Sequence, residues 1–132
     1  MASTIGTAVI VLISVFFLGM GMYALAAPAA LVRPFGIMLG ESASRSEVRA
    51  VYGGFGLAIA GVLVFAVIKQ GDVRTGILIA VGAALAGMAF GRLASAVLGD
   101  RTAFYPNWFY FVVEAVAAAA LFAASSAVIP SP

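Results

Sequence analysis

Long uninterrupted runs of apolar residues dominate this chain. They cover residues 4–27, 50–68, 76–98 and 108–129, and each meets the length of about 20 residues that a helix needs to cross a bilayer core of about 30 Å. A membrane β-barrel would instead show segments of about ten residues with alternating polarity. The pattern therefore predicts four transmembrane helices.

Polar and helix-breaking residues place the ends of these helices. The sequence Ser-x-x-Glu at Ser44 and Glu47 predicts a capping box, in which each side chain satisfies an exposed amide group near a helix start at Arg45. The polar residues 69–72 predict a tight turn, and Pro106 suits the first turn of the fourth helix. We therefore expect helices at about 4–27, 45–68, 74–98 and 106–129.

Short connections join most of these segments, so we expect one domain, 1–132, folded as an all-α, antiparallel four-helix bundle in the membrane. Residues 28–49 form a longer connection that is too apolar for a free loop, and we expect it to lie along the membrane interface. The first segment should stay as a helix rather than be cleaved as a secretion signal, because no Lys or Arg precedes it.

Composition supports this assignment and excludes much chemistry. The chain is 64% hydrophobic and 9% charged, whereas a soluble domain is about half apolar and a quarter charged. Cysteine and histidine are absent from the sequence, which excludes disulfides, thiol nucleophiles, zinc sites built from these residues and His-ligated haem. The net charge of +2 is no sign of nucleic acid binding. We expect no metal, no cofactor and no catalytic residue.

Two charged residues, Arg92 and Glu114, lie inside the predicted helices. Each is six residues from the end of its apolar run, at Leu98 and Trp108, on the same side of the membrane; this is about 9 Å deep at a rise of about 1.5 Å per residue. An isolated charge there costs roughly 2.5–3.5 kcal/mol on insertion scales. We therefore expect Arg92 and Glu114 to form an ion pair.

Other polar residues reach a similar depth on helical spacings of three and four. Asn107, Tyr110 and Glu114 share one face of the fourth helix, and Arg45, Arg49 and Tyr52 share one face of the second. If these faces turn inward, they form a polar pocket for an amphipathic or anionic head group. Its candidate residues are Arg49, Tyr52, Gly53, Gly54, Arg92, Ser95, Tyr110 and Glu114. In a purely structural interpretation, the arginines and tyrosines only anchor the helices at the interface.

Small residues form a second pattern. They recur every four positions on the third helix, at Ala83, Gly87, Gly91 and Ser95. Gly54 and Ala58 repeat this spacing on the second helix. Such ridges let two helix backbones approach closely. We expect them to pack the bundle against itself, and a homo-oligomer is the alternative.

Two motifs resemble a known family. Residues 47–54, Glu-Val-Arg-Ala-Val-Tyr-Gly-Gly, and residues 91–95, Gly-Arg-Leu-Ala-Ser, resemble the bacterial membrane proteins grouped as domain of unknown function 4345. That family is distantly similar to the DoxX-like four-helix membrane proteins. The resemblance implies a compact four-helix membrane fold and supplies no activity. Some DoxX-like relatives are similar to subunits associated with quinone-linked oxidoreductases, so the resemblance also allows a subunit role.

Arginine distribution predicts the orientation in a bacterial inner membrane. Arg33, Arg45, Arg49 and Arg101 lie in the loops of one side, and Lys69 and Arg74 lie on the other. The positive-inside rule then places the loops at 28–49 and 99–106 in the cytoplasm and both termini outside.

The function that we expect is the binding of an amphipathic or anionic small molecule or lipid in the polar layer. The alternative is an accessory subunit of a larger membrane complex. An enzyme that uses Glu114 as a general acid or base ranks below both. A proton-coupled transporter would be favoured by inverted repeats, and the sequence contains no convincing one.

Overall fold

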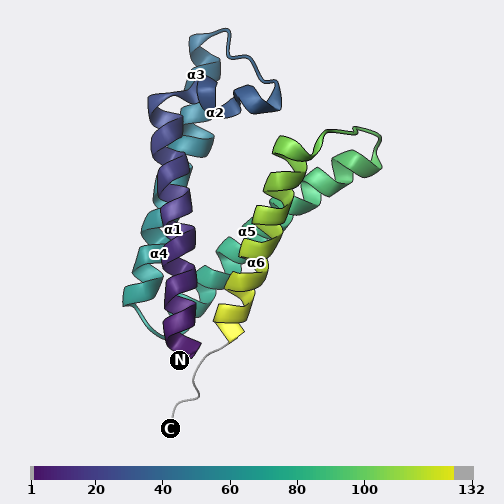
Figure 1. The fold of residues 1–132 in the computed structure, drawn as a ribbon. Coiled ribbons are helices and arrows are strands. Elements are labelled where there is room, and N and C mark those ends of the chain that lie inside the picture. The colour runs from purple at the N-terminus through teal and green to yellow at the C-terminus, as the bar shows by residue number, and fades with distance from the viewer. Residues whose placement is uncertain (1, 127–132) are drawn as a thin grey trace.

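The computed structural model describes residues 2–126, which fold into helices without any strand in that range. Its long elements are α1 (Ala2–Ala26), α4 (Phe55–Ile68), α5 (Asp72–Val97) and α6 (Phe109–Ser126) (Figure 1). Helix α3 (Ser42–Val48) continues into α4 through a π-helical turn, η2 (Arg49–Gly54), and a similar turn, η3 (Phe104–Trp108), precedes α6. Four stretches are long and apolar enough to span a membrane: Thr4–Ala26, Ser42–Ile68, Asp72–Val97 and Phe104–Ser126. The predicted all-α, multi-pass membrane fold is confirmed.

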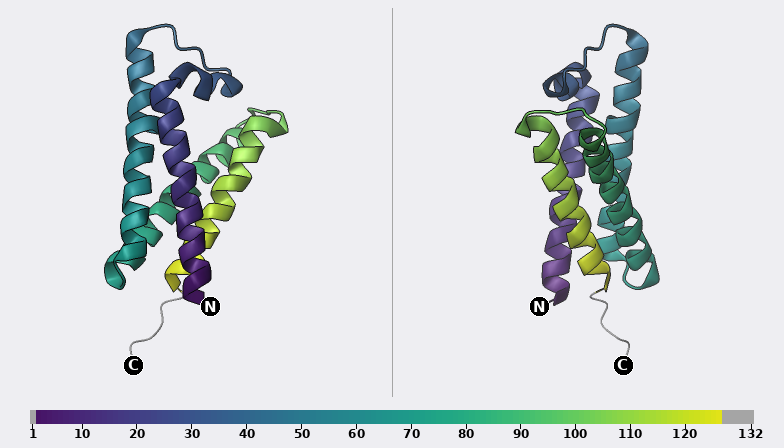
Figure 2. Two further views of the ribbon diagram at one scale, coloured as in Figure 1. Left: turned by 60° about the vertical axis from the view of Figure 1, so that its left-hand side comes forward. Right: turned by 90° about the vertical axis from the view of Figure 1, so that its right-hand side faces the viewer.

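The helices pack as two pairs that form a V. Helix α1 lies along α4, and α5 lies along α6 (Figures 1 and 2). The pairs meet near the start of α1 and diverge toward the other end of the molecule. Buried apolar residues from all four helices join them, including Ile10, Leu63, Leu78 and Leu121. The bundle is therefore closed at one end and open at the other.

Glycines bring the backbones of α1 and α4 into direct contact. A Cβ atom added to Gly21 would lie 2.8 Å from the carbonyl oxygen of Gly53, and one added to Gly56 would lie 3.1 Å from the carbonyl oxygen of Phe17. Lower in the same pair, the buried Ser14 hydroxyl donates a hydrogen bond to the carbonyl oxygen of Ala60 at 3.0 Å. Close backbone approach and interhelical hydrogen bonds are what hold helices together in lipid.

The expected role of the small-residue ridges within the bundle is wrong. A Cβ on Gly87 or Gly91 would meet no atom within 4 Å, and both residues are exposed. Gly54 and Ala58 are exposed as well. Helix α5 turns a different face inward, with Leu78, Val81, Leu85 and Ala89 buried. The close contact in the bundle uses Gly21, Gly53 and Gly56 instead.

The predicted capping box is also wrong. Helix α3 begins at Ser42, with Glu41 as an extended N-cap residue and no side-chain cap. Ser44 therefore lies inside the helix, and the amide of Arg45 already donates to the carbonyl oxygen of Glu41 at 3.2 Å. The turn at 69–72 agrees with the prediction, since α4 ends at Ile68 and α5 begins at Asp72. Residues 127–129 of the expected fourth helix lie outside the described residues.

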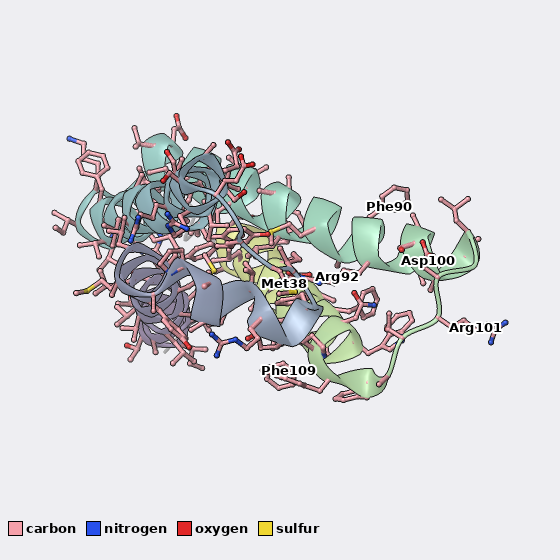
Figure 3. The ribbon with its side chains drawn as sticks, turned by 90° about the horizontal axis from the view of Figure 1, so that it is seen from above. Met38, Phe90, Arg92, Asp100, Arg101 and Phe109 are labelled. Atoms are coloured by element: carbon pink, nitrogen blue, oxygen red, sulfur yellow. The ribbon has the colours of Figure 1, made fainter. Side chains whose placement is uncertain are left out.

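A short segment crosses the open end of the V. It consists of α2 (Pro28–Val32) and η1 (Arg33–Phe35), and Figure 3 shows it from above, running from the top of α1 toward α6. The Phe35 ring reaches the Tyr110 ring of α6, with 5.6 Å between the ring centres. We call α2 and η1 together the crossing segment, and it covers the space between the helix pairs.

Candidate functional site

A cavity of about 700 Å³ lies between the two helix pairs at the open end. Helices α1, α5 and α6 form its walls, and the crossing segment contributes Leu31, Val32 and Phe35. Its apolar wall residues on the long helices include Val15, Phe17, Met20, Leu85 and Met88. Ligand pockets in proteins commonly enclose about 300–1,000 Å³. The cavity is thus large enough for a small molecule.

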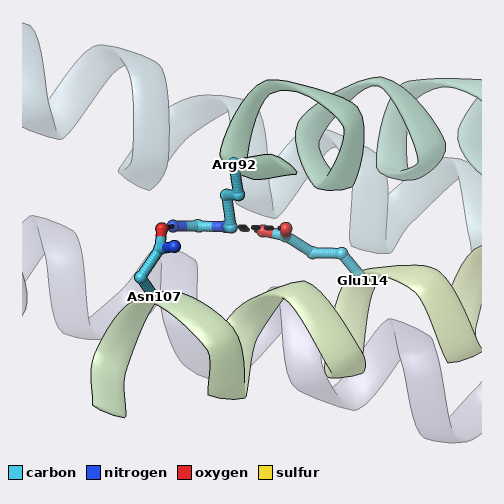
Figure 4. Close-up of polar contacts among 3 residues, drawn as sticks. All are labelled: Arg92, Asn107 and Glu114. Carbon is cyan, nitrogen blue, oxygen red and sulfur yellow. Dashed lines mark hydrogen bonds and ion pairs between the residues drawn. The ribbon is translucent and has the colours of Figure 1, made fainter. Parts of the chain in front are cut away.

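An ion pair forms the polar part of this cavity. Arg92 Nε donates to Glu114 Oε1 at 2.8 Å, and Arg92 Nη2 donates to Glu114 Oε2 at 3.0 Å (Figure 4). The Glu114 side chain is 5% exposed and the Arg92 side chain 21% exposed. Both carboxylate oxygens are therefore engaged by one planar guanidinium group, which is the strong, directional form of such a pair.

Three further groups hold the guanidinium of Arg92 in place. Its Nη1 atom donates to Asn107 Oδ1 at 3.4 Å (Figure 4). Its Cζ atom lies 5.5 Å from the centre of the Phe35 ring and 5.7 Å from that of Tyr110. These distances fit cation–π interactions, which require about 6 Å or less. The ion pair therefore ties α5 and α6 to the crossing segment.

The structure brings together half of the residues expected in the site. Tyr52, Arg92, Tyr110 and Glu114 line the cavity. Tyr52 comes from η2, on the opposite side of the V from the other three. The polar residues of the two helix pairs thus face one common space, with apolar side chains beside them.

The other four expected residues do not line the cavity. Arg49 Nε donates to the carbonyl oxygen of Leu25 at 3.0 Å and so joins η2 to the end of α1. Gly53 packs against the Leu25 side chain, and Gly54 is exposed. The Ser95 hydroxyl donates to the Asp100 carboxylate at 3.2 Å, where α5 ends. Because η2 is π-helical, residues three apart there do not share the face that α-helical spacing predicts.

Sequence reasoning missed the aromatic and apolar residues that complete the cavity. Phe35 reaches it from η1 and Tyr105 from η3, and Val15, Phe17 and Met20 reach it from α1. The apolar character of the connection at 28–49 was the signal available for Phe35. Within residues 2–126, no group of three or more His, Cys, Asp or Glu residues could hold a metal ion.

Comparison with known proteins identifies a family. The family model described as domain of unknown function (DUF4345) matches residues 5–125. A search of curated proteins and a search of solved structures gave no match. The family match includes nearly all of the four long helices and every cavity-lining residue, and it confirms the family that the two motifs indicated. The more distant likeness to DoxX-like proteins stays a prediction.

Proposed function

Because this chain belongs to the family named domain of unknown function 4345, whose description assigns no activity, we propose a function from its own geometry. The protein holds an amphipathic, lipid-like molecule in the cavity between its helix pairs. The single observation that carries this proposal is a cavity of about 700 Å³ whose apolar walls end at one polar layer. Such a lining is typical of a site for a molecule with an apolar tail and a small polar head.

Each part of the cavity has a role in this proposal. The tail lies against Phe17, Met20 and Leu85, and the head lies beside Arg92 and Tyr110. Glu114 orients Arg92 rather than acting as an acid or base, because both of its oxygens already accept hydrogen bonds from the guanidinium. We therefore propose binding without catalysis.

Filling the cavity should abolish ligand retention. Met88 lines the cavity, whereas Phe90, on the same helix, is 70% exposed and points away from the other helices (Figure 3). Native mass spectrometry of protein extracted in mild detergent should reveal an added small mass in the wild type. We expect Met88→Trp to lose this mass and Phe90→Trp to keep it. Retention of the mass by Met88→Trp would contradict a ligand in this cavity.

An accessory subunit of a larger membrane complex is the second candidate. The exposed Gly87 and Gly91, which meet nothing within 4 Å, favour it, since bare backbone on a lipid-facing helix permits close approach by another helix. Crosslinking in native membranes distinguishes the two functions. If Gly87→Leu releases a stable partner polypeptide, the subunit role is supported; recovery of self-contacts alone argues against it.

We also propose an orientation, in a bacterial inner membrane, with both termini outside the cytoplasm. The excess of arginine in the loops at 28–49 and 99–106 supports it. The natural chain has no cysteine, so single cysteines report the side directly. In intact cells, a membrane-impermeant maleimide should label Gln70→Cys but should label Thr102→Cys only after lysis. The reverse pattern would invert the topology.

A further inference from the structure

The ion pair determines which charge a ligand head can carry, if the proposed binding function holds. Among the described residues that line the cavity, Arg92 and Glu114 are the charged ones. Two short hydrogen bonds join them, so their charges compensate each other within the wall. The cavity is therefore polar at one level but carries no net charge there.

Arg92 nevertheless keeps hydrogen-bonding capacity. A guanidinium group has five N–H donors, and contacts to Glu114 and Asn107 use three of them. The remaining donors have no partner within residues 2–126. The Tyr52 and Tyr110 hydroxyls belong to the same lining. These groups can donate to an uncharged oxygen, such as that of a hydroxyl, ketone or ester.

An anionic head would fit this site poorly. It would bring a net negative charge into an apolar cavity, beside the Glu114 carboxylate, with no uncompensated cation in the described lining. Burying an unpaired charge in such surroundings is strongly unfavourable. Arg49 is bonded to the carbonyl oxygen of Leu25 and is not part of the lining.

We propose that the cavity selects an uncharged amphiphile, an apolar chain that ends in a hydroxyl or carbonyl head, and rejects phosphates and carboxylates. Glu114 is the positioning residue that sets this preference. It neutralises the charge of Arg92 while it leaves donors of Arg92 available.

A matched pair of lipids tests the preference. Monooleoylglycerol and its phosphate ester, oleoylglycerol phosphate, share the same chain and differ by one anionic group. The delipidated full chain in mild detergent should bind monooleoylglycerol at least ten times more tightly, as measured by titration in native mass spectrometry. Equal or tighter binding of the phosphate ester would overturn the inference and leave the proposed function standing. Binding of neither lipid would overturn the proposed function itself.

A substitution of similar shape tests the role of Glu114. Glu114→Gln removes the compensating charge, so the phosphate ester should bind this variant at least ten times more tightly than it binds the wild type. Asp100→Asn removes a carboxylate outside the cavity lining and should leave the preference for the uncharged lipid unchanged. An unchanged preference in Glu114→Gln would show that Glu114 does not set the head charge. The wild-type comparison of the two lipids stands independently of how well this variant folds.

Discussion

Glu114→Ala should lower the free energy of unfolding in detergent by about 3–5 kcal/mol, because it leaves the charge of Arg92 without its partner. Glu114 accepts both short hydrogen bonds from Arg92, at 2.8 and 3.0 Å, and its side chain is 5% exposed. Asn107, at 3.4 Å from Nη1, offers a neutral amide that cannot compensate the charge. Titration with a denaturing detergent, followed by far-ultraviolet circular dichroism, measures the loss.

Two controls separate the charge from the side-chain volume. Asp100→Ala also removes a carboxylate, but on an exposed residue, and should change stability by less than about 1 kcal/mol. The double variant Arg92→Met with Glu114→Leu removes both charges and should recover most of the stability, since an apolar replacement of a buried pair is often neutral or stabilising. If the double variant is as unstable as Glu114→Ala alone, an unpaired charge is not the cause.

Gly21→Ala should produce the second largest loss, about 1–3 kcal/mol, through overpacking. The new Cβ would lie 2.8 Å from the carbonyl oxygen of Gly53 and 2.9 Å from the amide nitrogen of Leu57. Both atoms belong to the backbone of the neighbouring helix, so relief requires α1 and the η2–α4 segment to separate. The same detergent titration measures the effect.

Gly61→Ala is the matched control for Gly21→Ala. Gly61 lies on α4 and is exposed, and a Cβ atom added to it would meet no atom within 4 Å. The substitution should be neutral or slightly stabilising, because alanine favours a helix over glycine. Equal losses in the two variants would mean that the contact of Gly21 with the η2–α4 segment is not the cause of the loss.

The ion pair could be predicted from the sequence, because the prediction did not require knowing how the helices pack. The depths of Arg92 and Glu114 follow from counting along each helix, and the cost of an isolated charge in lipid supplies the pairing. The turn at 69–72 was predictable for a similar reason, since four consecutive polar or turn-forming residues interrupt two apolar runs. Both features depend on local sequence and membrane depth alone.

Which helix faces turn inward could not be predicted. In water, burial of apolar residues selects the inner face, but lipid accepts the same residues equally well. Here Phe90 and Val97 are 70% and 78% exposed, while Leu78 and Leu121 are fully buried. Hydropathy does not distinguish these positions. For that reason the spacing of Gly87 and Gly91 indicated an internal ridge that the structure places on the outside.

The hydrogen-bond partners of Arg49 and Ser95 could not be predicted from the spacing of polar residues. They depend on where the backbone ends α1 and α5. Arg49 bonds to the carbonyl oxygen of Leu25 at the end of α1, and Ser95 bonds to Asp100 where α5 ends. The divergence of the two helix pairs, which creates the cavity, likewise follows from where the helices make contact. Close backbone contact at Gly21 and Gly56 joins α1 to α4, and the ion pair is one of the contacts that join α5 to α6.

The pairing of Arg92 with Glu114 has a consequence for biogenesis. Synthesis reaches Arg92 first and Glu114 22 residues later, so α5 emerges from the ribosome with a charge whose partner does not yet exist. Helices α1 and α4 carry no charged residue, so neither brings an unpaired charge into lipid. We expect α5 to enter the bilayer more readily once α6 supplies Glu114, because the ion pair then offsets the cost of the Arg92 charge. The two helices would then enter the bilayer together as a hairpin, and the second wall of the cavity would be added to the first in one step.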